Sequence, residues 1–251
     1  KLVELSYRNA KHIQLERLRR IEKTKNRQHN KRLMEQMKSD LHLKDRPTHI
    51  ECFDNSNIHG VNPVAACVVF KNGRPSKKEY RHFNIKTVDG PDDFASMEEV
   101  VYRRYKRLVK EGKDLPQLII IDGGKGQLSS AVKSLELLEL MGKIAIIGIA
   151  KKLEEIYFPG DSVPLYLDKR SETLKLIQQA RNEAHRFSIN HHRNQRSSDA
   201  LHTSLENIPG VGPKTIQKLI THFGSVKRVL EADEKELINL VGIEKAKLLR
   251  N

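Results

Sequence analysis

The chain has 251 residues, which is room for one large domain or two small ones. Only 37% of its residues are hydrophobic and no apolar run approaches the length of a membrane span, so we expect a soluble protein with no membrane partner. The formal net charge of +14 at pH 7 favours a polyanionic partner, although charge alone does not separate DNA from RNA or from an anionic membrane.

The start of the chain and its cysteines both indicate the cytoplasm. The first residues, KLVELSYRNAKHIQ, lack the apolar centre and the small-residue cleavage site of a signal peptide. The two cysteines, Cys52 and Cys67, lie in apolar runs typical of strands. We therefore expect two buried thiols in a reducing compartment, rather than a zinc site or a disulfide.

Residues 1–47 form a basic helical or linker segment in this interpretation, with 14 Lys and Arg against 6 Asp and Glu. No proline or glycine occurs before Pro47, but the apolar spacing fails between Glu22 and Arg32. The polar stretch there either has no partner, as a solvated helix or a connector, or it is an electrostatic arm that contacts a nucleic acid. These two alternatives stay open.

Residues 48–194 alternate between strand and helix patterns. A hairpin is predicted around Asn72-Gly73, and the apolar run 117–122 is typical of a strand buried on both faces. The elements predicted in chain order are strands 49–54, 65–73 and 77–85, helix 92–111, strand 117–122, a helix to about Met141, strand 143–150, a small hairpin over 156–167, and helix 171–190. The fold class that follows is α/β, a mixed sheet flanked by helices.

A polar stretch, HHRNQRSSDA, separates this region from a small all-α domain at residues 203–251. Two helical units are predicted there, 204–223 and 235–250, and each is broken by a turn that contains glycine. The repeat predicts a tandem helix-hairpin-helix domain. Such a domain contacts the DNA backbone rather than the base edges, so we expect binding without sequence selectivity.

The glycine turns carry the candidate DNA-binding residues. In the first unit the turn Gly210-Val211-Gly212 precedes a helix, where free backbone amides suit a phosphate, and Lys214 adds positive charge. In the second unit Gly242 and Lys245 take the corresponding places, but a glutamate replaces the second glycine. The second hairpin either holds phosphate less well or serves mainly to pack against the first.

Two aspartates end two different apolar strands, Asp54 after HIECF and Asp122 after LIII. Aspartates at the carboxyl ends of neighbouring strands meet at one edge of a sheet, where they can hold Mg²⁺ or Mn²⁺. Each alone is equally well explained as a turn residue, but the order of elements around the pair fits a ribonuclease H-like fold. A nucleotide triphosphatase is excluded, because no G-x-x-x-x-G-K-[ST] run precedes LIIIDGG.

The chain also resembles a known family over residues 48–251. The blocks that carry the resemblance occur in the family's order, and they are ECFDNSN, VAACVVFKNG, EYRHFNIK, DDFASMEEVVYRRY, LIIIDGGKGQL, RNEAHRFSINHHR and IPGVGPKT. They are similar to the C-terminal half of the UvrC excinucleases. The resemblance implies a ribonuclease H-like endonuclease domain that makes the incision 5′ to a lesion in nucleotide excision repair, followed by tandem helix-hairpin-helix motifs.

The resemblance also implies a set of site residues. Asp54, Asp122 and His185 correspond to the family's metal site, with His185 either a ligand or a proton-transfer group. Asp93 corresponds to a further carboxylate and Lys151 to a lysine near the site. Taken alone, Asp93 is equally explained as an acid in the first turn of a helix and Lys151 as a solvated strand end.

The partners implied by the resemblance are double-stranded DNA that carries a lesion and, for a full-length protein, UvrB with UvrA-dependent loading. The family's N-terminal nuclease domain and its UvrB-binding segment have no counterpart in these residues, so we expect a fragment of a longer protein. The alternative from a different class is a non-catalytic DNA-binding scaffold; ribonuclease activity on hybrids rests on the fold alone.

Overall fold

The computed structural model describes residues 2–56, 64–86, 88, 92–150, 154–206, 208, 210–224 and 226–249, without the side chains of residues 56, 191–206 and 227. The chain forms two compact units, Lys1–Ser188 and Ile189–Asn251, which are described here one at a time. In the part of the chain that is described, no helix is both long enough and apolar enough to cross a membrane.

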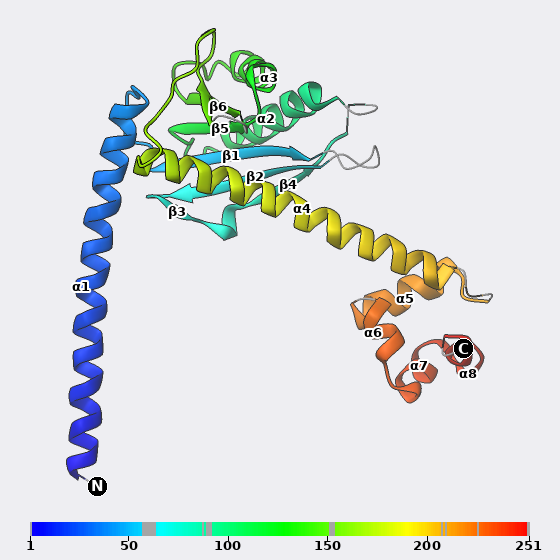
Figure 1. Ribbon diagram of the computed structural model, residues 1–251. Helices are drawn as coiled ribbons and strands as arrows, with labels where there is room; N and C mark the ends of the chain where they lie inside the picture. Colours follow the sequence, from blue (N-terminus) through cyan, green and yellow to red (C-terminus); the bar gives the residue numbers. More distant parts are fainter. Residues whose placement is uncertain are drawn as a thin grey trace. The chain divides into compact units, whose positions relative to one another are not determined.

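A mixed sheet forms the centre of the first unit (Figure 1). Its strands are β1 His49–Ser56, β2 Val64–Lys71, β3 Arg74–Pro75, β4 Arg81–Asn84, β5 Leu118–Asp122, β6 Ala145–Ala150 and β7 Glu155–Tyr157. The order is β3-β2-β1-β5-β6-β7, with β4 also paired to β2. The three central strands β1, β5 and β6 are parallel, so their carboxyl ends share one edge of the sheet.

The hairpin predicted around Asn72-Gly73 is confirmed. Both residues have positive φ, 50° and 74°, as the favoured two-residue hairpin turn requires. After the short β3, a 3-10 turn at Lys77–Glu79 leads into β4, which returns along the other half of β2.

The second predicted hairpin, over residues 156–167, is reduced to one bridge. Ile156 and Leu165 exchange two backbone hydrogen bonds of 3.1 and 2.7 Å, and no longer ladder forms between them among the described residues. Pro159 and Pro164 flank the bridge and have no amide hydrogen to donate, which explains why the pairing does not extend.

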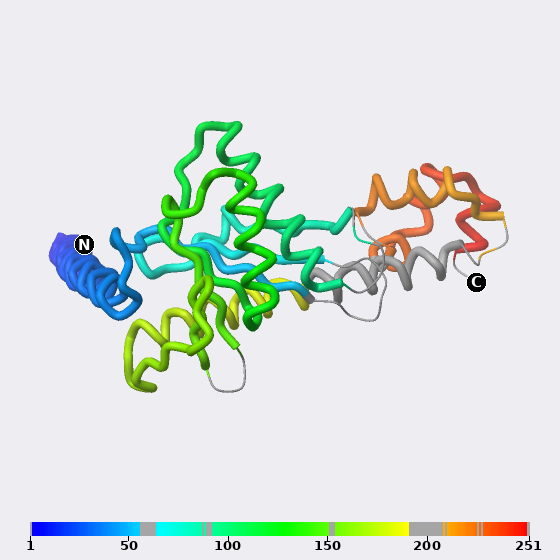
Figure 2. Tube along the Cα trace, turned by 90° about the horizontal axis from the view of Figure 1, so that it is seen from above, coloured from blue at the N-terminus to red at the C-terminus, as the bar shows by residue number. Residues whose placement is uncertain are grey.

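Helices cover both faces of the sheet. α1 Leu2–Asp40 and α4 Glu172–Glu206 contribute to one core, and α2 Asp93–Lys110 and α3 Lys125–Leu137 contribute to the other. Figure 2, which looks along the sheet, shows α2 and α4 on opposite sides of it. The strands alternate accordingly, because Cys52 and Ile120 face α4 while Phe53 and Ile121 face α2 and α3.

The last turns of α1 belong to the core of this unit. Leu33, Met34 and Met37 are buried in the same cluster as the sheet, whereas almost every side chain before them is exposed. The core therefore includes residues that the sequence interpretation assigned to a separate basic segment. Both cysteines are buried with free thiols, as expected.

The helix predicted at 171–190 is longer than expected. α4 continues to Glu206, so the polar stretch 191–200, which the sequence interpretation placed between the two domains, is helical. That stretch contains neither proline nor glycine, and polar residues are compatible with a solvated helix. Polarity alone therefore predicted the end of this helix wrongly.

The second unit is all-helical, as predicted. After α4 it contains α5 Pro213–Phe223, α6 Val226–Glu231, α7 Glu234–Val241 and α8 Ile243–Leu248. Its small apolar core is formed by Val211, Ile216, Leu219, Val226, Val229, Ala232, Leu237, Ala246 and Leu249. The two glycine turns stand before α5 and before α8, and α6, which was not predicted, lies between the two hairpins.

Candidate active site

Three predicted site residues come together at the carboxyl edge of the sheet. Asp54 lies near the end of β1, Asp122 is the last residue of β5, and His185 lies on α4. One potential ligand atom from each lies within 4.8 Å of the others. Phe53 pairs with Ile121 in the parallel ladder, so the two aspartates follow at the same level of adjacent strands.

The three side chains differ in their exposure. Asp54 and Asp122 are 2% and 6% exposed, whereas the His185 side chain is 44% exposed. The distance from Nδ1 of His185 to Oδ2 of Asp54 is 3.3 Å, within the range of a hydrogen bond. Two carboxylates held near each other with little access to water repel one another, and a cation between them offsets that repulsion.

Contacts on both sides of His185 position α4 against the sheet. The Tyr80 hydroxyl donates to Oε1 of Glu183 at 3.1 Å. The ring of Phe187 stacks on His82 with centroids 3.8 Å apart and meets Tyr80 edge to face at 5.1 Å. These contacts lie two residues before and two residues after His185, so they fix the rotation of α4 that places the imidazole beside Asp54.

A buried charge network under the sheet was missed in the sequence. Glu51 is fully buried and accepts hydrogen bonds from Nη2 and Nε of Arg104 at 2.5 and 3.1 Å and from the Tyr105 hydroxyl at 2.9 Å. Burial raises the pKa of Glu51, but hydrogen bonds from His49 and Arg104 outweigh it and hold that pKa at about 2. The glutamate inside the apolar strand HIECF was the available signal.

Asp93 lies in the first turn of α2, next to the cluster but not among its grouped ligand atoms. Its carbonyl oxygen accepts from Nδ2 of Asn55 at 2.9 Å, which joins the start of α2 to the end of β1. Partial burial, and then the charges of Asp92 and Asp54, raise the pKa of Asp93. The proposed role of Asp93 stays a prediction, and Lys151 lies outside the described residues.

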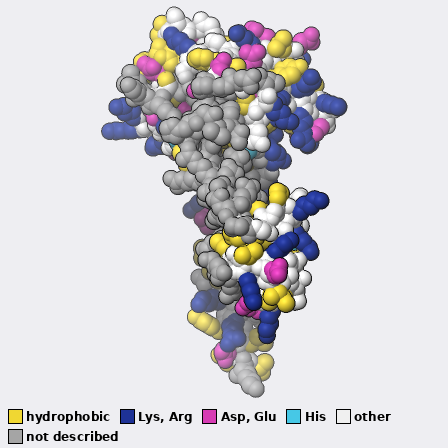
Figure 3. All heavy atoms as spheres, turned by 90° about the vertical axis from the view of Figure 1, so that its right-hand side faces the viewer, with side chains coloured by type: hydrophobic (Ala, Val, Ile, Leu, Met, Phe, Trp, Pro, Cys, Tyr) yellow, Lys and Arg dark blue, Asp and Glu magenta, His cyan; other side chains and the backbone are white. Residues whose placement is uncertain are grey.

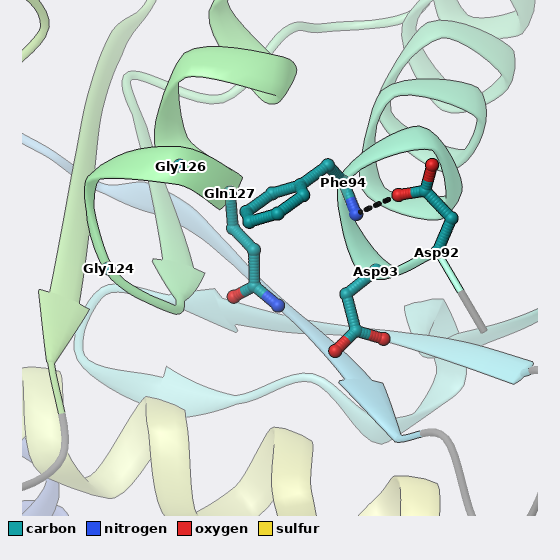
Figure 4. A pocket seen from close by; sticks show the side chains of 6 residues that line it. All are labelled: Asp92, Asp93, Phe94, Gly124, Gly126 and Gln127. Atoms are coloured by element: carbon teal, nitrogen blue, oxygen red, sulfur yellow. Dashed lines mark hydrogen bonds between the residues drawn. The ribbon is translucent and has the colours of Figure 1, made fainter.

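A hollow of about 730 Å³ opens beside Asp93 (Figure 4). Its lining residues come from the start of α2 and from the segment after Asp122, and they are Asp92, Asp93, Phe94, Gly124, Gly126 and Gln127. The Asp92 carboxylate faces away into its own helix, where it accepts from the amides of Phe94 and Ala95 as the N-cap.

The first glycine turn has the backbone geometry that its sequence predicted. Gly210 has a φ of 91°, and a Cβ there would lie 3.0 Å from Leu248. Gly212 is the N-cap of α5 without a side-chain cap, and Lys214 is exposed in the first turn. The amide of Val211 donates to Ile208, so the amides available for an anion are those nearer the start of α5.

The second turn follows the same plan and is linked to the first. Gly242 has a φ of 87° and is both the C-cap of α7 and the N-cap of α8. Nζ of Lys245 donates to Oγ1 of Thr215 at 3.3 Å, a direct contact between the two hairpins. Figure 3 shows Lys and Arg side chains at the surface of the described residues.

Comparison with protein families identifies the chain. The model for the UvrC RNAse H endonuclease domain matches residues 38–189. The chain belongs to this family. A second model, the SAM-like helix-hairpin-helix tandem, matches residues 203–250. The predicted family and the ribonuclease H-like fold class, with a following helix-hairpin-helix domain, are confirmed.

Longer proteins are identical to this chain at about two thirds of the aligned positions. The proteins named UvrABC system protein C from Christiangramia forsetii and Flavobacterium psychrophilum are each 66% identical, over 100% and 98% of this chain. The chain covers 42% and 41% of them, so it spans about two fifths of the length of these relatives.

Solved structures show a weaker likeness. The crystal structure of human ENDOV is 14% identical, covering 67% of this chain and 99% of that one, with a TM-score of 0.36. Endonuclease V of Ciona intestinalis, in complex with DNA that contains an inosine, is 18% identical over 59% of this chain and 65% of that one, with a TM-score of 0.32.

Proposed function

We propose that this chain is a divalent-metal-dependent DNA endonuclease that makes the 5′ incision of nucleotide excision repair. The observation that carries the proposal is the convergence of Asp54, Asp122 and His185 at one edge of the sheet, in a member of the UvrC endonuclease domain family. Mg²⁺ or Mn²⁺ is the metal we propose, because the two carboxylates are the oxygen ligands that both ions prefer.

The donor set fits such an ion. One donor atom from each of the three residues lies within 4.8 Å of the others, so together they would hold one cation. The two buried carboxylates supply the negative charge that a divalent cation needs in a site with little water.

When bound, a divalent ion in such a site polarises the scissile phosphate and lowers the pKa of an attacking water. The residues of this chain have separate tasks around it. Asp54 and Asp122 hold the metal position from the rigid centre of the sheet. His185 completes the ligand set, and its exposed side chain can also exchange a proton with solvent.

The DNA-binding part of the proposal rests on the helical unit. Two glycine turns, each at a helix start and each with a lysine nearby, suit two phosphates of a DNA backbone. The net charge of +14 supplies long-range attraction. We propose double-stranded DNA with a lesion as the substrate and, for a full-length protein, UvrB with UvrA-dependent loading as the partner.

Nicking of supercoiled plasmid DNA in Mn²⁺ or Mg²⁺ tests the proposal. We expect Asp54→Asn and Asp122→Asn to abolish nicking and to weaken Mn²⁺ binding in calorimetry, with DNA binding retained. Asp114→Asn, at an exposed aspartate before β5, is the matched control and should nick like the parent. Nicking by both site variants at the parental rate would show that the site is assigned wrongly. No nicking and no metal binding by the parent would favour the non-catalytic scaffold.

A further inference from the structure

One exposed aromatic ring stands beside the candidate active site. All seven phenylalanines are described, and Phe94 is the only exposed one, at 54%. Its ring lines the hollow between the start of α2 and the segment after Asp122 (Figure 4). The ring is therefore available to a ligand that enters the hollow, and covering it would be favourable.

The ring is held in place and is not loosely attached. A Cβ at Gly126 would lie 2.4 Å from Cε1 of Phe94, so the ring packs directly on the backbone of α3. The amide of Phe94 donates to the Asp92 cap at 2.9 Å. The position therefore requires both a glycine opposite the ring and a capped helix start below it.

The hollow lies beside the segments that follow the two aspartates of the candidate metal site. The side chain of Gln127 lies against Gly123, the residue that directly follows Asp122, and it would have to move to admit a Cβ there. On the other side Asn55, the residue after Asp54, donates to the carbonyl of Asp93. Phe94 is thus one residue away from the contact that joins α2 to the Asp54 strand.

The polar groups of the hollow favour a base over a phosphate. The Asp93 carboxylate adds negative charge, which repels the sugar-phosphate backbone. The Gln127 amide offers both a donor and acceptors, and the Asp93 carboxylate accepts. Together with an aromatic ring, these groups match the face and edge of a nucleobase, with its ring surface and its amino and carbonyl groups.

We propose that Phe94 stacks on an unpaired base of the DNA strand next to the scissile phosphate, and that the hollow receives this base. The proposal rests on the proposed function, since it takes DNA as the substrate at Asp54 and Asp122. Taking a base out of the duplex stack costs least where the base is already unpaired. Phe94 is therefore a positioning residue that favours DNA whose pairing is disturbed at the incision point.

A fluorescent base tests this inference. The probe is a duplex with one unpaired 2-aminopurine, bound by the full chain in Ca²⁺ so that binding is followed without cleavage. We expect binding to quench the probe, and Phe94→Leu, which keeps apolar packing on Gly126, to remove most of the quenching. We also expect Phe94→Leu to weaken binding about 5- to 150-fold, the usual range for one stacked base. Phe94→Tyr and Phe94→Trp should restore both.

The control is Tyr166→Leu, which removes another exposed aromatic ring from the same unit and should leave the quenching unchanged. A parental level of quenching and affinity in Phe94→Leu would overturn the proposal, and so would a Tyr variant that behaves like the Leu variant. The test does not depend on nicking. If the parent never nicks but Phe94→Leu loses the quenching, the endonuclease proposal fails while base stacking stands.

Discussion

The buried pair of Glu51 and Arg104 gives the sharpest prediction for stability. Glu51 is fully buried and the Arg104 side chain is 13% exposed, and two hydrogen bonds join them. Replacing Arg104 by methionine keeps much of the side-chain volume but removes the positive charge and two hydrogen bonds from the buried carboxylate. Breaking a buried pair in this way costs about 3–5 kcal/mol, and the slight exposure of Arg104 places the expected loss near 3 kcal/mol.

The chain forms two compact units, so the loss of unfolding free energy should be measured in the strands of the first unit rather than on the whole chain. Amide hydrogen exchange of peptides from β1 and β5, at pH 7, reports the free energy of unfolding of the sheet. Arg107→Met is the matched control. Arg107 lies on the same helix and pairs with Glu111 at the surface, so amide exchange in β1 and β5 of the Arg107→Met variant should match that of the parent.

A double variant separates the pair from its surroundings. With Glu51→Leu added to Arg104→Met, no unpaired carboxylate remains, and the sheet should be more stable than with Arg104→Met alone. A loss below about 1 kcal/mol for Arg104→Met, or a double variant less stable than that single variant, would refute this account of the network.

Three further predictions follow from single residues. The pKa of Glu51 is lowered from 4.5 to about 2, so its charge contributes stability above pH 4.5 that is lost as the pH falls toward 2. At pH 7 the parent should therefore be about 3 kcal/mol more stable than Glu51→Gln. Acid unfolding followed by circular dichroism should show this difference in free energy narrowing between pH 4.5 and pH 2. Gly210→Ala should lower the melting temperature of the chain's helical unit through its φ of 91° and the Leu248 contact, whereas Gly212→Ala, with open space and negative φ, should not. Lys214→Gln should weaken DNA binding and reduce the slope of log affinity against log salt by about 1 in a fluorescence titration, and an unchanged slope would remove Lys214 from the phosphate contacts.

Much of the sheet could be predicted from local pattern. The run LIIID is apolar on both faces, as only a central strand can be, and β5 lies at the middle of the sheet. The two aspartates were expected to meet because each ends a strand, and the parallel pairing of β1 with β5 brings them to one edge. The approach of Asp54 to Asp122 was therefore within reach of the sequence.

The third member of the cluster was not within reach of spacing alone. His185 lies 131 residues after Asp54 on a helix, and its position depends on how Phe187 and Glu183 dock against Tyr80 and His82. Only the family resemblance suggested it. The pairing of Glu51 with Arg104 could not be predicted from spacing either, since Arg104 lies 53 residues away on another element.

The rotation of α4 that places His185 has a consequence for how the protein responds to its metal. Two of the three donors belong to the sheet, but the third is supplied by a separate layer. An ion bound by all three would cross-link those layers, and every tenfold excess of ion over its dissociation constant would add about 1.4 kcal/mol to their docking. A higher metal concentration would then stabilise the packing of α4 on the sheet. A substitution that weakens the packing of α4 would lower the affinity for the ion.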